Sequence, residues 1–227
     1  MNHSLKNKCF FLLFCIAASF TGNAQSEFDK KIAATVCTCI ENSKNEFDSA
    51  FAFCMAQAME VHEDLVLQEM QAQKIDSTEE AGYKWGQQIF NRISVSLIYD
   101  CDVYFRLMDS IMQSALTIKN KDEVIEEMKL FHAVGPNKRD FEYFIQRGAA
   151  QLQLNQYDAA LQDFDSSLAK TDPNLGALFF KAITLERLYR FDEAIELFAT
   201  LVALTGTREM KILYALAKRR KALHLQK

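Results

Sequence analysis

Residues 147–164 read RGAAQLQLNQYDAALQDF, and residues 181–198, which follow 34 positions later, read KAITLERLYRFDEAIELF. Eight positions in and around this stretch recur with similar size and polarity and without a gap. The matched pairs are Phe144/Leu178, Gly148/Ala182, Tyr157/Phe191, Asp158/Asp192, Ala160/Ala194, Leu161/Ile195, Phe164/Phe198 and Leu168/Val202. A period of about 20–50 residues is typical of stacked supersecondary units. Such units bind other polypeptides more often than they catalyse reactions, which favours a binding protein over an enzyme.

The small residues of this repeat predict close contact between paired helices. Both copies of the repeat have alanine at one position, Ala160 and Ala194, and so small a residue lets two helices cross closely. Phe164 and Phe198 fill the space toward the next unit. With its period of 34, the pattern resembles the tetratricopeptide repeat family, whose unit is a helix-turn-helix. The resemblance implies two repeats within residues 139–208 and a capping helix over residues 209–227. It also places Asp158 and Asp192 at helix N-caps.

The same resemblance implies a concave groove lined by the first helix of each unit. The groove-facing positions are Ile145, Ala149, Leu152, Phe179, Ile183 and Arg187. Relatives that grip a peptide carboxylate use several Lys, Arg and Asn side chains here, and only Arg187 fits that pattern. We therefore expect an apolar peptide or helix as the ligand. The alternative, which the sequence leaves open, is that the N-terminal half of the chain already covers this surface.

The first 24 residues have the features of a secretory signal peptide. Lys6 and Lys8 are followed by an apolar stretch of about a dozen residues, which is too short to span a bilayer as a helix. Gly22 and Ala24 then provide the small residues of a cleavage site, so that Gln25 becomes the mature N-terminus. The prediction is an exported protein, periplasmic or secreted, with no membrane insertion after the signal is removed.

Four cysteines follow the predicted signal: Cys37, Cys39, Cys54 and Cys101. An even number of cysteines in an exported chain predicts disulfides. Cys37 and Cys39 lie on opposite edges of one helical stripe, about 200° apart, so each can bond to a different neighbouring helix. The sequence does not decide the connectivity, although Cys37–Cys101 and Cys39–Cys54 is the preferred pairing. Each bridge is expected to stabilise the fold by about 2–4 kcal/mol.

A second function class depends on the same cysteines. Cys37, Cys39 and Cys54, with Met55 and Met59 nearby, offer soft ligands for a copper or zinc ion, or for thiol chemistry. The methionines, however, stand at helical spacing among apolar residues, as in core packing. We therefore expect structural disulfides, no metal and no cofactor, and keep a metal- or thiol-handling factor as the alternative.

Helical periodicity dominates the rest of the N-terminal half. One stripe runs from Phe28 to Ile40, a second helix carries Cys54, and a third, from Thr78 to Thr117, carries Cys101. Together they predict a three-helix bundle within residues 25–134, joined by the two bridges. Gly82 and Gly86, four residues apart, suggest that a second helix approaches the third one closely. The fold class is thus all-α: a disulfide-stapled helical bundle followed by a short helix-turn-helix array with a C-terminal capping helix.

Charge and motifs exclude several functions. Removal of the signal leaves 24 basic and 30 acidic residues, a net charge of −6, which argues against a nucleic-acid surface. The basic run from Lys218 to Lys221 is expected to be the solvated face of the capping helix. No zinc-protease motif follows His62-Glu63, and the chain has no phosphate loop or nucleophile elbow. The sequence therefore predicts no enzyme and no catalytic residue, and its expected partner is another protein or a peptide segment.

Overall fold

The described part of the chain is built from α-helices. The computed structural model describes residues 26–43, 47–115 and 120–226, and these ranges contain eleven α-helices, one short 3-10 helix and no strand. The helices are α1 (Glu27–Asn42), α2 (Phe47–Val61), α3 (Glu63–Ala72), α4 (Glu79–Asp100), α5 (Asp102–Ala115), α6 (Lys121–Ala133), α7 (Phe141–Gln153), α8 (Tyr157–Leu168), α9 (Leu175–Arg187), α10 (Phe191–Thr205) and α11 (Arg208–His224). The all-α prediction is confirmed. The predicted signal peptide lies outside the described residues.

The N-terminal half contains five helices where the sequence predicts three. The second predicted helix is interrupted at His62, which separates α2 from α3. The third is interrupted at Cys101, whose backbone is extended (φ −128°, ψ 110°), so the prediction of one helix from Thr78 to Thr117 is wrong. Cys101 caps the end of α4, and its carbonyl accepts the first hydrogen bond of α5, from the Phe105 N–H. The chain therefore turns at a single extended residue, Cys101, and the spacing of the apolar residues continues from α4 into α5.

The core of the bundle lies between α1, α2 and α4. Ile32 and Val36 on α1 and Ile93 and Leu97 on α4 have no exposed surface. These positions recur every four residues, so one face of each helix is apolar and the two faces bury each other. Gly82 and Gly86 do not belong to this contact, since nothing lies within 4 Å of the Cβ that either would carry. The predicted close approach at these glycines is wrong.

The two copies of the repeat form two packed helix pairs, α7/α8 and α9/α10. Ala160 and Ala194 are completely buried, as are Phe164 and Phe198. A Cβ on Gly148 would lie 2.7 Å from the ring of Phe164, so the ring packs against α7 at a distance that leaves no room for a side chain at this position. The small and the aromatic residues that match in the two copies of the sequence repeat therefore occupy equivalent buried positions in the two helix pairs.

The turns inside the two pairs are also equivalent, but they do not have the predicted caps. The N-caps of α8 and α10 are Gln156 and Arg190, neither of which caps with its side chain. Asp158 and Asp192 instead lie in the first turn, so their prediction as N-caps is wrong. There a carboxylate still interacts favourably with the positive end of the helix dipole.

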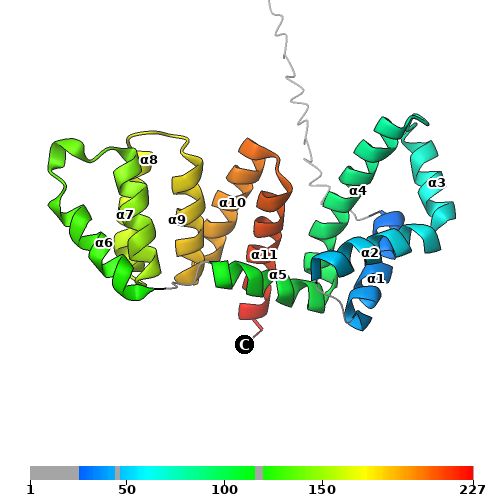
Figure 1. Ribbon diagram of the computed structural model, residues 1–227, viewed down its shortest axis with the longest axis horizontal. Coiled ribbons are helices and arrows are strands. Elements are labelled where there is room, and N and C mark those ends of the chain that lie inside the picture. Colours follow the sequence, from blue (N-terminus) through cyan, green and yellow to red (C-terminus); the bar gives the residue numbers. More distant parts are fainter. Residues whose placement is uncertain (1–25, 44–46, 116–119, 227) are drawn as a thin grey trace, which may run out of the picture.

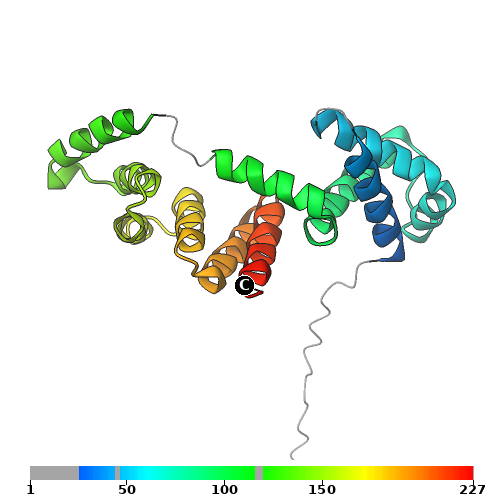
Figure 2. The ribbon, with the colours of Figure 1, turned by 90° about the horizontal axis from the view of Figure 1, so that it is seen from below.

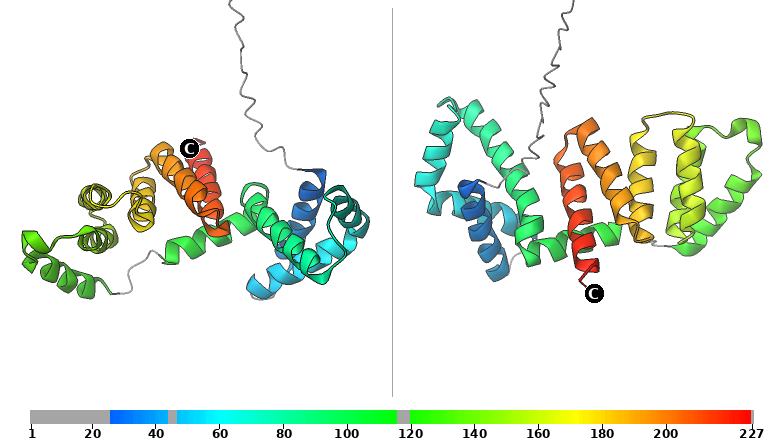
Figure 3. Two further views of the ribbon diagram at one scale, coloured as in Figure 1. Left: turned by 90° about the horizontal axis from the view of Figure 1, so that it is seen from above. Right: turned by 180° about the vertical axis from the view of Figure 1, so that it is seen from behind.

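Both ends of the array are covered by other parts of the chain. Within the range predicted as the N-terminal bundle, α6 packs on α7, through Val124, Met128 and Phe131 against Tyr143. At the other end, α11 packs between α10 and α4. The bundle therefore contacts the last helix of the array (Figure 1; Figure 3, right), while α5 runs from the bundle along the array toward α6 (Figure 2; Figure 3, left).

Candidate functional site

The basic cluster of α11 lies at the junction of the bundle with the array. The side chains of Arg219 and Arg220 are only 13% and 15% exposed. The prediction that residues 218–221 form a solvated face is therefore wrong for these two arginines, although Lys218 is exposed. The sequence could not show this, because the partners of both arginines lie more than 30 positions earlier in the chain.

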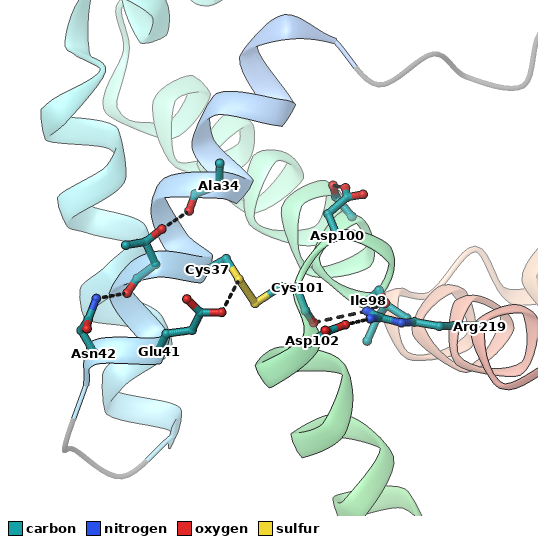
Figure 4. Close-up of a disulfide and its surroundings, with 11 residues drawn as sticks. Ala34, Cys37, Glu41, Asn42, Ile98, Asp100, Cys101, Asp102 and Arg219 are labelled. Atoms are coloured by element: carbon teal, nitrogen blue, oxygen red, sulfur yellow. Dashed lines mark hydrogen bonds and ion pairs between the residues drawn. A yellow bond between two sulfur atoms is a disulfide. The ribbon is translucent and has the colours of Figure 1, made fainter. Parts of the chain in front are cut away.

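Arg219 binds the corner between α4 and α5. Its guanidinium donates to the carbonyl oxygens of Ile98 (2.6 Å) and Cys101 (3.3 Å), and it also pairs with Asp102. Its charged centre lies 4.4 Å from the ring centroid of Phe105, within the range of a cation–π contact. Figure 4 shows the arrangement, with the Cys37–Cys101 disulfide on the opposite side of the same corner. The corner is thus fixed covalently to α1 and electrostatically to α11.

Arg220 bridges the bundle side and the array side with two carboxylates. Its Nε donates to Asp109 of α5 at 2.6 Å, and its Nη1 donates to both oxygens of Glu186 of α9 at 3.0 and 2.8 Å. Burial raises the pKa of the Glu186 carboxyl above its usual range, while Arg220 acts in the opposite direction and only partly offsets it. Burial also works against the charged form of Arg220, but Glu186 and Asp109 outweigh it and raise the pKa of Arg220.

A cavity of about 320 Å³ opens beside this ion network. Phe105 and Asp109 of α5 form one wall, and Ile183, Glu186 and Arg187 of α9 form another. The turn between α9 and α10 and the end of α11 complete the lining. The cavity is therefore built from both halves of the molecule, which is a frequent position for ligand sites.

Tyr189, in the turn beside the cavity, has a backbone conformation that suits few residues. Its φ is +58°, and the equivalent Asn155 of the first pair has a φ of +60°. Asn adopts the left-handed region readily, whereas a bulky aromatic residue does so at a cost. Tyr189 is 67% exposed, so it does not compensate by filling the core. It stacks on His224 at 4.9 Å between centroids and forms an aromatic wall of the cavity.

The six predicted groove positions are divided by the structure. Leu152 and Ile183 are buried, so neither offers its side chain to a partner on the surface of the array. Ile145, Ala149, Phe179 and Arg187 remain partly exposed. The cavity brings together Ile183 and Arg187 and contains none of the other four.

The four cysteines form two bridges. Cys37 is bonded to Cys101 and Cys39 to Cys54, which is the preferred pairing. The three cysteines of the alternative metal site are therefore divided between two disulfides. Cys37, Cys101 and Glu41 do bring potential ligand atoms within 4.8 Å of one another. A cysteine sulfur, however, binds a metal as the thiolate, and these two sulfurs are bonded to each other.

A second cavity, of about 710 Å³, lies between α1 and α2. Its lining carries no charged side chain, and consists of polar residues such as Thr38, Asn42 and Gln57 with Phe53 and Val61 at its apolar wall. Phe53 and Val61 are 60% and 64% exposed. This groove lies next to the Cys39–Cys54 bridge and offers a surface for uncharged groups.

Sequence reasoning missed most of the residues at the junction cavity. Asp109, Tyr189 and His224 belong to three separate segments, and no motif connects them. Glu186 carried a signal, because a carboxylate three residues after the apolar Ile183 stands on the same helical face and needs a buried partner. That partner, Arg220, stands 34 positions later, and only the fold of α11 brings the two together.

None of the known protein-family models matches the chain, and no curated protein or solved structure shows significant similarity to it. In the part of the chain that the structure describes, no helix has both the length and the apolar character needed to cross a membrane.

Proposed function

We propose that the chain is a non-enzymatic interaction protein that binds an apolar peptide or helix on the face formed by α7 and α9. The supporting observation is that these two first helices contact each other and keep apolar side chains partly exposed: Ile145 and Ala149 on α7, and Phe179 on α9. In this proposal, α7/α8 and α9/α10 are repeats of the tetratricopeptide type. The partner is another protein, since the charge balance disfavours nucleic acid.

The arrangement of neighbouring helices supports this choice of face. α6 packs on α7 through Tyr143 and Ala150, which lie on a different side of α7 from Ile145 and Ala149. α5 reaches α9 near its C-terminal end, where Asp109 and Glu186 share Arg220. Phe179 lies two turns earlier on α9 and is therefore away from this contact.

The disulfides support an exported location for the protein. Structural disulfides persist in oxidising environments and are rare in the reducing cytosol. Two bridges in one small bundle therefore favour an exported protein, as the signal-like N-terminus also does. Mass spectrometry of the purified natural protein is expected to find Gln25 as the first residue, and a soluble protein that retains residues 1–24 would contradict export.

The binding face can be tested with two adjacent aromatic residues. Both rings are partly exposed and pack against the core, but Phe180 stacks on the completely buried Phe164 (5.9 Å between centroids), whereas the ring contact of Phe179 is the perpendicular one with Phe180. Phe179→Ala should weaken partner capture, by about 2 kcal/mol or more if this ring anchors the ligand, with a small change in Tm. Phe180→Ala should mainly lower Tm.

The measurement combines site-specific photo-crosslinking in the exporting cell with thermal unfolding of the purified variants. A crosslinker at position 149 should give a partner band that is lost in the Phe179→Ala background, and one at Thr200 on the outer helix α10 should not. If positions 149 and 200 crosslink alike, or if Phe179→Ala lowers Tm as much as Phe180→Ala, the α7–α9 face is not the binding surface.

The metal- or thiol-handling alternative is separated by a thiol count. The interaction protein needs all four cysteines in bridges, so unreduced mature protein should contain no free thiol. Two or more reactive thiols per chain would favour the alternative, with Cys37, Cys39 and Cys54 as the residues to examine.

A further inference from the structure

We propose that the junction cavity between α5, α9 and α11 binds a small aromatic acid, with the aromatic ring against Tyr189 and His224 and the carboxylate on Arg187. This site goes beyond the proposed peptide binding, because it has a different occupant and does not include Ala149 or Phe179. Its volume of about 320 Å³ is near the lower end of the range of ligand sites, which is about 300–1,000 Å³.

The aromatic wall is the first reason. In the first helix pair the turn has Asn155, a residue type that tolerates positive φ, yet the equivalent position of the second pair is occupied by Tyr189, which is 67% exposed. Non-glycine residues in this region cluster at ligand clamps, where the strain is retained for the side chain's role. Here the ring stacks nearly parallel (21°) on His224, and Phe191 lies 6.1 Å away. The three rings form a surface for a planar group.

The charged residues of the cavity are the reason for expecting a carboxylate on the ligand. Asp109 and Glu186 both accept hydrogen bonds from Arg220, so the two carboxylates already have a cation. Arg187 lines the same cavity, and its charge also acts on Glu186, but no hydrogen bond or ion pair within 4 Å holds its guanidinium among the described residues. Nη2 of Arg220 also has no hydrogen-bond partner among the described residues. The guanidinium of Arg187 is therefore a charged donor of the lining that has no hydrogen-bond partner among the described residues, and a guanidinium matches a carboxylate well.

Three indole probes of nearly the same shape test this assignment. Indole-3-acetate carries the anion, indole-3-acetamide is neutral, and tryptamine carries a cation. Isothermal titration at neutral pH and low salt should give a Kd for indole-3-acetate at or below about 1 mM, at least about tenfold tighter than for the other two. Tightest binding by tryptamine would overturn the assignment of the anion to Arg187. No binding of any probe at several times that concentration would overturn the site.

Two variants and one matched control locate the probe. Arg187→Gln should weaken indole-3-acetate about tenfold while leaving indole-3-acetamide unchanged. Tyr189→Gly should weaken both probes severalfold and should keep or raise Tm, because glycine adopts positive φ without strain. Asn155→Gly makes the same change in the turn of the first pair and should leave the affinity unchanged. Equal effects of the two glycine variants would place the probe elsewhere and contradict the proposal.

This result can be distinguished from the outcome for peptide binding. Phe179→Ala leaves every lining residue of the junction cavity in place, so indole-3-acetate should bind that variant as it binds the parent. Loss of probe binding in folded Phe179→Ala protein would mean that the probe occupies the α7–α9 face, and this outcome would also overturn the junction site.

Discussion

Gly148 shows how one position without a side chain determines the distance between two helices. The ring of Phe164 occupies the place where a Cβ would stand, and that ring has no exposed surface into which it could move. The equivalent position in the second pair is Ala182, which is also completely buried, so the second pair accommodates the Cβ that the first pair does not. The 34-residue repeat predicted a small residue at position 148, and the position of the Phe164 ring explains why that residue is glycine.

Gly148→Ala is expected to destabilise the protein. The added methyl must displace a buried ring, and overpacking of this kind costs about 1–3 kcal/mol, more than the helix propensity that alanine gains over glycine. Gly86→Ala is the matched control, since the same methyl meets empty space on α4 and should stabilise by about 0.5–1 kcal/mol. Urea unfolding of both variants measures the difference. Equal free energies of unfolding would show that α7 and α8 do not pack as described.

At the scale of single residues, the sequence predicted which small and aromatic side chains are buried better than it predicted the hydrogen bonds of polar side chains. Ala160, Ala194, Phe164 and Phe198 are core residues, as the repeat implied, because size and apolar character act wherever the residue is packed. The role of Asp158 as an N-cap was wrong by two positions, since a cap depends on the residue at which the helix begins. Polar side chains act over one or two hydrogen bonds, so small errors in helix boundaries change their partners.

At the scale of elements, the corner at Cys101 was hidden from the sequence for a physical reason. A single extended residue between α4 and α5 changes the direction of the chain but leaves the apolar residues of both helices facing the same core. Periodicity therefore reads through the corner, and neither glycine nor proline marks it. What stabilises the corner comes from outside it: the bridge to Cys37 and the guanidinium of Arg219.

The two bridges should contribute unequally to stability. Cys37–Cys101 spans 64 residues and Cys39–Cys54 spans 15, and the chain-entropy estimate for loops of these lengths is about 4 and about 3 kcal/mol. Cys37→Ala/Cys101→Ala should therefore lower the free energy of unfolding more than Cys39→Ala/Cys54→Ala. The first pair also removes the covalent link of the corner to α1. Denaturant unfolding under oxidising conditions compares the two, and the reverse order would contradict a role of the long bridge in holding the corner.

At the scale of the whole molecule, the contact between α4 and α11 could not be predicted. An array of only two helix pairs has two ends that need cover, and either α6 or the bundle could have packed on the first pair. The structure uses α6 at the first helix pair and places the bundle against the last helix. Local patterns cannot choose between these ends, because the choice depends on residues more than 100 positions apart, such as Arg219 and Ile98. The junction cavity, which exists only because of this choice, was therefore invisible as well.

The ion network at the junction should make stability depend on pH through Glu186. Burial raises the pKa of Glu186 in the folded state, so the folded protein binds this proton more tightly than the unfolded chain does. Its contribution to stability is then fully present below the unfolded pKa of about 4.3 and is lost as pH rises through the raised folded pKa. Glu186→Gln removes this dependence, while Asp109 remains as a partner for Arg220.

The expected result is that the Tm of Glu186→Gln, relative to that of the parent, rises as pH increases from 4 to 7. Glu193→Gln is the control of opposite sign, because its hydrogen bond with Arg190 lowers the pKa of the exposed Glu193, and its contribution is lost as pH falls. Differential scanning calorimetry of the three proteins from about pH 3 to pH 7 measures both slopes, that of Glu193→Gln at and below the unfolded pKa of about 4.3. If the difference in Tm between Glu186→Gln and the parent is constant with pH, the pKa of Glu186 is the same in the folded protein and the unfolded chain, and burial at the junction does not raise it.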